Sequence, residues 1–194
     1  MKTLAWDVDD VLNNLIGEWF EKHWRLKNPG CKLNYEDLRE NPPFRILGVG
    51  YEDYLSSLDE FRLLPAASGM MPSPEVLLWF TNHGSKFRHI GLTARPIMSV
   101  PGLAEWVFKH FGRWIRTFHF VPSLRAEGGI PVYDASKKEY LGWLGKADVL
   151  IDDMPENIEA ARELGIKGVL IPRPWNRAPE GINRALEPLT SMIA

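Results

Sequence analysis

Closely spaced carboxylates stand out near the start of the sequence. Asp7, Asp9 and Asp10 follow residues 3–6, a run of β-branched and apolar residues that is typical of a short buried strand. Open α/β sheets bind their ligands where parallel strands end, so these acids are expected at a binding edge. Asp7 and Asp9 can point to the same side, where two carboxylates repel each other unless a cation or a shared proton neutralises them.

Two later apolar runs also end in polar residues. The run 87–93 leads into Thr93-Ala94-Arg95, and the run 148–151 leads into Asp152-Asp153. No cluster of His and Cys offers a zinc site, whereas carboxylate and carbonyl oxygens are the ligands that Mg²⁺ prefers. The sequence therefore favours an oxygen-lined site.

The elements that must position these residues alternate along the chain. Helical patterns are predicted at 73–84, 101–111, 136–144 and 155–164, and strands at 3–6, 87–93, 117–121, 148–151 and 169–171. Such alternation predicts an α/β fold with a doubly wound parallel sheet. Residues 15–70 carry helical patterns alone, at 14–28, 34–40 and 51–63. We therefore expect a core of residues 1–14 and 71–194, with residues 15–70 as a small helical cap. Within the core, residues 122–134 are expected to form a loop that contains Gly128-Gly129.

Composition narrows the class of protein. With 45% hydrophobic and 25% charged residues, the chain is expected to be a soluble globular protein. A net charge of −2 argues against binding to nucleic acid polymers or anionic membranes. No apolar run reaches the roughly 18 residues of a membrane span, and no signal-peptide pattern is present. Cys31 is the single cysteine, so a cytoplasmic location is expected; the oligomeric state stays open.

Three motifs together resemble the haloacid dehalogenase-like (HAD) superfamily of phosphohydrolases. They are DVDDVLNN (7–14), LTARP (92–96) and LIDDMPEN (150–157), in the superfamily's order. The resemblance implies a doubly wound core with a helical cap inserted after the first motif. It also implies a Mg²⁺-dependent enzyme that hydrolyses a small phosphomonoester through an aspartyl-phosphate intermediate. A Walker-type kinase is excluded, because Gly48-Val49-Gly50 is not followed by a GK[ST] sequence.

In this resemblance the first motif supplies the reacting groups. Asp7 is the expected nucleophile, and Asp9 the general acid that protonates the leaving oxygen and then activates water. Asp9 favours phosphatase chemistry, because the dehalogenases lack this second Asp and the P-type ATPases have Thr instead. Asp10 stands where relatives often have Gly, and we expect it to make a local turn hydrogen bond.

The second motif is expected to bind phosphate. The Thr93 hydroxyl and the backbone N–H groups of Ala94 and Arg95 can bind phosphoryl oxygens. The Arg95 side chain can equally reach substrate phosphate or form a structural ion pair.

The resemblance also requires a lysine that neutralises the phosphoryl group. Lys137 and Lys138 both open the helix before the last acidic strand, so either can serve. The spacing from Lys137 to Tyr140 resembles the K-x-x-Y of some relatives and favours Lys137.

The metal ligands are expected from two strand ends. Asn157 aligns with the family residue four positions after the ligand, which makes Asp153 the direct ligand. Asp152 then holds the lysine or a metal-bound water. The protein ligands of the expected octahedral Mg²⁺ site are then Asp7, Asp153 and the backbone carbonyl of Asp9.

The IDD ending, the small cap and Pro174-Trp175-Asn176 most resemble the 5′(3′)-deoxyribonucleotidases. That resemblance implies a nucleoside monophosphate substrate, whose base would stack on a cap aromatic. The candidates are Trp19, Phe20, Trp24 and Phe44. At least one of these rings is expected to face the mouth above Asp7, although the same rings can instead pack the cap together. The alternatives are hydrolysis of a sugar phosphate or other small phosphorylated metabolite, and a catalytically idle phosphate-binding protein.

Overall fold

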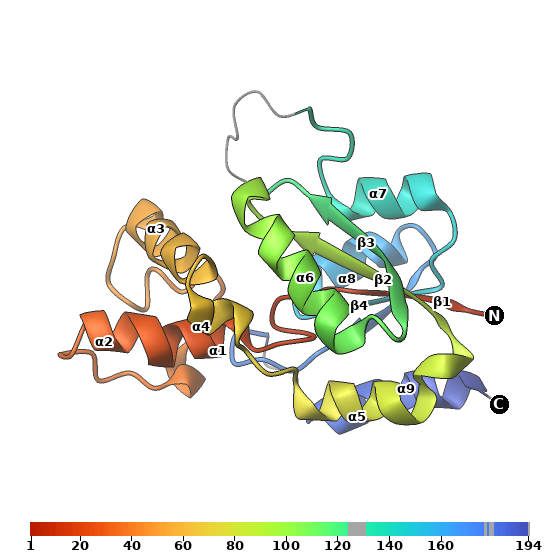
Figure 1. Ribbon diagram of the computed structural model, residues 1–194, viewed down its shortest axis with the longest axis horizontal. Coiled ribbons are helices and arrows are strands. Elements are labelled where there is room, and N and C mark those ends of the chain that lie inside the picture. Colours follow the sequence, from red (N-terminus) through yellow and green to blue (C-terminus); the bar gives the residue numbers. More distant parts are fainter. Residues whose placement is uncertain (124–130, 177, 179–180, 194) are drawn as a thin grey trace.

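The computed structural model describes residues 1–123, 131–176, 178 and 181–193. Within them, all strands belong to one parallel sheet of order β3-β2-β1-β4-β5 (Figure 1). The strands are β1 (Thr3–Trp6), β2 (Arg88–Ala94), β3 (Ile115–Val121), β4 (Val149–Asp152) and β5 (Lys167–Leu170). The predicted doubly wound α/β fold is confirmed.

Strand β1 lies at the centre of the sheet. All four of its residues are buried, as expected for a strand covered by helices on both faces. Trp6 is in register with Gly91 of β2 and with Ile151 of β4. The chain runs outward from β1 through β2 to β3 and then crosses to β4, so the direction of winding changes between β1 and β4. Ligands of open α/β sheets bind outside the carboxyl ends of strands at such a point.

Helices cover both faces of the sheet. Leu4 and Trp6 point to a core cluster built with α5 (Pro74–His83), α6 (Val100–Phe111) and α9 (Ile182–Thr190). Ala5 points to the opposite face, where α7 (Lys137–Leu144) and α8 (Pro155–Arg162) close a second cluster. The two clusters fix the orientation of β1 and β4, and therefore of the acids at their ends.

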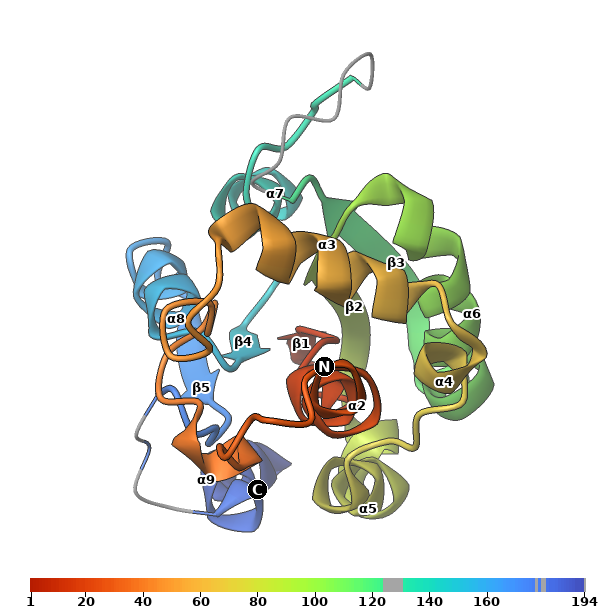
Figure 2. The ribbon, with the colours of Figure 1, turned by 90° about the vertical axis from the view of Figure 1, so that its left-hand side faces the viewer.

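Residues 15–70, here called the helical insert, lie beyond the carboxyl end of β1 (Figures 1 and 2). Their helices are α1 (Leu15–Trp19), α2 (Arg25–Lys27), α3 (Tyr51–Arg62) and α4 (Pro65–Ser68), with a π-helical turn at Phe20–Trp24 and a 3₁₀ turn at Tyr35–Asp37. The insert has its own hydrophobic cluster, which includes Trp19, Phe20, Leu58 and Phe61. We propose that the insert is the cap expected from the sequence.

The structure differs from the predicted elements near residue 34 and at the end of the chain. The helix predicted at 34–40 is one 3₁₀ turn, which a capping box of Asn34 and Asp37 opens and which ends at Leu38, whose φ of −75° and ψ of 70° are not helical. Helix α9 was not predicted, and it carries Pro188 in its interior. Most of the loop that holds Gly128-Gly129 lies outside the described residues. In the described parts of the chain no helix is long and apolar enough to cross a bilayer.

Candidate active site

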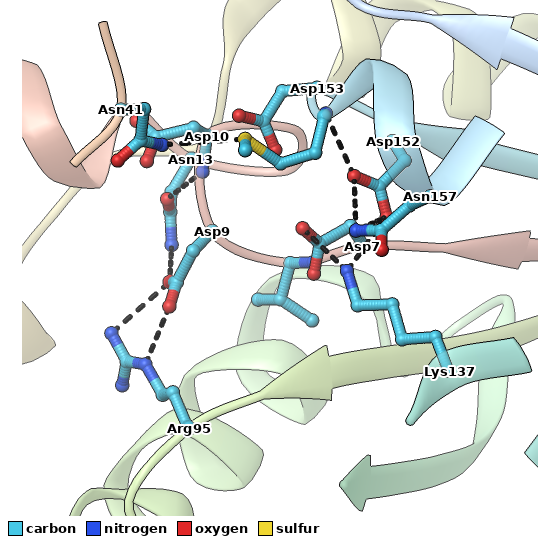
Figure 3. A network of polar contacts seen from close by, with 12 residues as sticks. Asp7, Asp9, Asp10, Asn13, Asn41, Arg95, Lys137, Asp152, Asp153 and Asn157 are labelled. Atoms are coloured by element: carbon cyan, nitrogen blue, oxygen red, sulfur yellow. Dashed lines mark hydrogen bonds and ion pairs between the residues drawn. The ribbon is translucent and has the colours of Figure 1, made fainter. Parts of the chain in front are cut away.

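Three carboxylates meet where β1 and β4 end (Figure 3). The Asp7 amide extends the backbone pairing of β1 with β4, because it donates to the Ile151 carbonyl at 2.8 Å. This pairing brings Asp7 beside the acids at the end of β4. Among the described residues, one oxygen from each of Asp7, Asp152 and Asp153 lies within 4.8 Å of the others, and all three residues are buried.

Lys137 is the cation of this group. Its Nζ lies 2.9 Å from Asp7 Oδ2 and 2.7 Å from Asp152 Oδ2. Ser136 caps α7 by accepting from the Glu139 amide, which places Lys137 in the first turn facing β1 and β4. Burial alone would lower the pKa of Lys137, but Asp152 and Asp7 outweigh it and raise that pKa, so the ammonium stays charged. Lys138 instead pairs with Glu163 on the surface.

Asp152 is fully used as an acceptor. Its Oδ1 accepts from the Met154 amide at 2.9 Å and from Asn157 Nδ2 at 3.0 Å. Its Oδ2 accepts from Lys137, with a further 3.1 Å contact to Asn157. Asp152 and Asn157 therefore orient the lysine, and both were expected as supporting residues.

Asp153 contacts a residue whose role the sequence did not indicate. Trp175 donates its indole N–H to Asp153 Oδ2 at 2.8 Å, and Asn176 Nδ2 donates to the Asp153 carbonyl at 2.8 Å. The Trp175 ring also packs against the hydrophobic cluster of the insert, edge-on to Tyr35. Trp175 thus links a predicted metal ligand to the insert. Only the tripeptide around it was singled out in the sequence, and its spacing of more than 20 residues from Asp153 gives no local signal.

The chemistry of the acids fits a divalent cation. Three buried carboxylates and one ammonium leave an excess of two negative charges when all are ionised. Burial raises the pKa of Asp7 well above its ordinary 3.8; Lys137 opposes this, while Asp152 and Asp153 add to it. Burial and Asp152 likewise raise the pKa of Asp153. A bound dication removes this repulsion, so Asp7 and Asp153 would hold Mg²⁺ while Asp152 holds Lys137.

Metal binding should therefore strengthen as the pH rises. In the metal-free protein, protonated Asp7 and Asp153 stabilise the folded state below the ordinary carboxyl pKa, and this stabilisation is lost as the pH rises through their raised pKa values. Mg²⁺ must displace those protons. We expect saturating Mg²⁺ to raise Tm by roughly 3–5 °C more at about pH 8 than at about pH 5. Differential scanning calorimetry measures this. Asp153→Asn should abolish the difference between the two pH values, and the matched control Glu159→Gln, on the surface of α8, should retain it. An equal shift at both pH values would contradict the assignment.

Asp9 faces away from this group and toward two arginines. Arg95 binds it in a bidentate fashion, with Nε 2.6 Å from Oδ2 and Nη2 3.1 Å from Oδ1 (Figure 3). Arg62, from the last turn of α3, brings Nη2 to 3.8 Å from Oδ2. Burial opposes ionisation of Asp9, but Arg95 and Arg62 outweigh it and lower the pKa of Asp9. Of the two alternatives for Arg95, the structure shows the ion pair, and in this arrangement Asp9 is an anion.

Thr93 keeps a free hydroxyl at the end of β2. Its Oγ1 is buried and has no hydrogen-bond partner among the described residues, which is rare for a buried polar atom. The Arg95 amide differs from the expectation, since it donates to the Val121 carbonyl at 3.4 Å rather than remaining free. Thr93 is therefore the second-motif group best suited to a ligand oxygen.

Asp10 makes the local hydrogen bond expected of it. Its φ of 59° lies in the left-handed region, which explains why Gly suits this position. Its Oδ1 accepts from the Ile16 amide at 3.0 Å, at the start of α1. Arg173 reinforces the turn by donating from Nε to the Asp10 carbonyl at 2.6 Å.

The cap aromatics are placed differently from the prediction. Trp19 and Phe20 are fully buried, and Trp24 is 7% exposed, all within the hydrophobic cluster of the insert. Phe44 is half-buried against the same cluster, in edge contact with Tyr51 and with the Arg45 guanidinium over its ring. The prediction of a stacking ring above Asp7 is wrong for Trp19, Phe20 and Trp24, because these three rings are buried against other side chains of the insert.

Comparison with solved structures identifies the class of fold. The chain resembles the haloacid dehalogenase-like family hydrolase SP0104 from Streptococcus pneumoniae with a TM-score of 0.66 and 12% identity, over 99% of this chain and 98% of that one. It resembles a HAD family hydrolase from Deinococcus radiodurans, with bound phosphate and sodium, at a TM-score of 0.58 and 14% identity, over 99% and 95%. The protein therefore has the HAD-like fold.

A third similar structure is YfnB from Bacillus subtilis, which is bound to magnesium. Its TM-score is 0.59 at 12% identity, over 99% of this chain and 98% of that one. No protein-family model and no curated protein matches the sequence. At these identities the likeness concerns the fold alone, so activity must be argued from the site.

Proposed function

We propose that this protein is a Mg²⁺-dependent phosphomonoesterase that acts on small phosphorylated metabolites through an aspartyl-phosphate on Asp7. The observation that carries the proposal is the buried group of Asp7, Lys137 and Asp153 at the carboxyl edge of the sheet, with Asp152 holding the lysine. A carboxylate nucleophile, a fixed cation and a second acid for metal are the parts that phosphoryl transfer needs. The phosphate and the magnesium in two structures of the same fold add support.

In the first half of the reaction, Asp7 attacks phosphorus. The bond from phosphorus to the ester oxygen breaks as the bond to the Asp7 carboxylate forms. Asp9 is an anion beside Arg95, so it must first separate from Arg95 and take up a proton from solvent, which it then donates to the leaving oxygen. Lys137 and the free hydroxyl of Thr93 stabilise the charge on the phosphoryl oxygens.

In the second half, water attacks the same phosphorus. Asp9 takes a proton from the water, the bond from Asp7 to phosphorus breaks, and inorganic phosphate leaves. Asp7 and Asp153 would hold Mg²⁺, whose positive charge would keep Asp7 ionised and offset the negative charge of the phosphoryl group. Asp152 and Asn157 keep Lys137 in place throughout.

The packing of the insert supports our proposal for the substrate class. A nucleotidase reading depends on a ring that stacks the base, an interaction of ~1–3 kcal/mol in nucleic-acid binders. Burial of Trp19, Phe20 and Trp24 leaves only Phe44 of the four rings on which that reading rested, and Phe44 packs against the hydrophobic cluster of the insert. A small metabolite recognised by polar and charged groups, such as Arg62, fits the site better.

A phosphate-release assay tests the proposal. We expect turnover of p-nitrophenyl phosphate and of several metabolite phosphates, with kcat/KM for sugar phosphates above that for deoxynucleoside monophosphates. EDTA should abolish the activity and Mg²⁺ restore it, while Zn²⁺ should substitute poorly. Full turnover after exhaustive chelation would contradict the metal assignment. Binding of phosphate without any turnover would instead indicate an idle binding protein.

A further inference from the structure

Two guanidinium groups from different parts of the chain converge on Asp9. Arg95 comes from the end of β2, and its side chain is 3% exposed. Arg62 comes from the helical insert, and its side chain is 10% exposed. The Asp9 carboxylate therefore interacts with a cation of the insert, Arg62, and with a cation of the core, Arg95.

Arg62 is incompletely satisfied in this arrangement. Its Nη1 donates to Asp59 at 3.0 Å, but its Nη2 lies 3.8 Å from Asp9, beyond hydrogen-bond distance. Its Nε is buried and has no partner in the described part of the chain. A buried N–H without an acceptor is unfavourable, so Arg62 has capacity for another acceptor. A cavity of about 30 Å³ beside Arg62 and Arg95, lined also by Met70, Leu103 and Trp106, has room for one such oxygen or water.

The proposed reaction removes the acceptor that the two arginines share. Asp9 can protonate the leaving oxygen only after it turns from Arg95 toward the Asp7 side. That movement would take the Asp9 carboxylate away from the buried Arg95 guanidinium, to which it is hydrogen-bonded. It would also take Asp9 away from Arg62. Unpaired buried charges are strongly unfavourable, so a second anion must replace Asp9 if the movement is to occur readily.

We propose that Arg62 and Arg95 form a subsite for a second anionic group of the substrate, and that this group takes the place of the Asp9 carboxylate. The inference rests on the proposed phosphomonoesterase function and narrows its substrate class. The substrate is a small phosphomonoester that also carries a carboxylate or a second phosphate. Arginine suits either group, because its planar donors bind both in a bidentate fashion. Asp9, held by the arginines without substrate, is released for proton transfer when the correct substrate binds.

Matched substrate pairs test this in the wild-type protein. Glycerol 3-phosphate and 3-phosphoglycerate differ by one carboxylate, and glucose 6-phosphate and glucose 1,6-bisphosphate differ by one phosphate. We expect the member with the second anion to have a kcat/KM about 10- to 100-fold higher in at least one pair, as for one or two charged hydrogen bonds. The pair that shows the preference distinguishes a carboxylate from a phosphate ligand.

Variants test whether Arg62 is responsible for the preference for a second anionic group. Arg62→Gln should reduce the ratio of kcat/KM within the preferred pair to near one, and Arg62→Lys should retain part of it. The matched control is Arg25→Gln, which removes an exposed arginine of the insert that pairs with Glu21, and it should leave the ratio unchanged. Calorimetric binding of the same pair to the Asp7→Asn protein gives the preference without turnover.

The outcomes separate the two proposals. If the wild-type protein hydrolyses the plain monoesters but gains nothing from a second anion in either pair, the subsite is wrong and the phosphomonoesterase stands. The subsite is equally wrong if Arg62→Gln and Arg25→Gln give the same ratio as the wild type. If no ester releases phosphate, the proposed function fails, and the subsite with it.

Discussion

Replacing Asp7 by Asn should lower phosphate release from p-nitrophenyl phosphate roughly a thousandfold or more, because the reaction loses its nucleophile rather than one contact. The fold should survive, since Asn can still accept from the Val8 amide, which donates to Asp7 Oδ1 at 2.7 Å. Steady-state phosphate release and circular dichroism measure the two effects. A variant with near wild-type turnover would show that Asp7 is not the attacking group.

Asp10→Asn is the matched control for this change. It is the same substitution three residues further on, at a carboxylate that accepts from Ile16 instead of facing the acids. Burial raises the pKa of Asp10 to about 7, against the field of Arg173, so the Asp10 carboxyl is only about half ionised at neutral pH and Asn removes less than a full charge. Asn also tolerates the left-handed backbone at this position. We expect activity within about tenfold of the wild type, since the residue is structural.

Replacing Lys137 by Met should affect both stability and activity. Asp7 and Asp152 would remain buried without their cation, and loss of one partner of a buried pair costs about 3–5 kcal/mol. Urea unfolding of the metal-free protein measures this free energy. Activity with Mg²⁺ should fall by about 10²–10³-fold, as for removal of one preorganised group that stabilises the transition state.

Lys138→Met is the control that the sequence itself provides. Lys138 is the neighbouring residue, but its side chain is 44% exposed and pairs with Glu163 on the surface. We expect a change of no more than about 0.5 kcal/mol in the free energy of unfolding and normal turnover. Equal effects at the two positions would contradict the choice of Lys137.

Local patterns predicted the fold well because its elements are marked by local signals. The buried runs of β1 and β4 and the serine cap of α7 can each be read within a few residues. Helix α9 could not, because Pro188 argues against a helix interior. Burial of Leu186 and Leu189 and the hydrogen bond from Trp79 to Thr190 stabilise it from elsewhere in the chain.

The candidate site was predictable where strand ends and nearby sequence motifs place its residues. The ends of β1 and β4 place Asp7, Asp152 and Asp153 together, as parallel strands require. The contacts of Arg62 with Asp9 and of Trp175 with Asp153 arise from the packing of the insert on the core. Such contacts join residues more than 20 positions apart, and no local pattern encodes them.

Trapping the covalent intermediate tests the central proposal most directly. The wild-type protein would be mixed with Mg²⁺ and p-nitrophenyl phosphate, quenched in acid during turnover and digested for tandem mass spectrometry. We expect one phosphoryl group, labile to hydroxylamine as an acyl phosphate is, on the side chain of Asp7, and none in Asp7→Asn. Continued phosphate release with no phosphoryl group on Asp7, or with the group on another residue, would contradict the proposal.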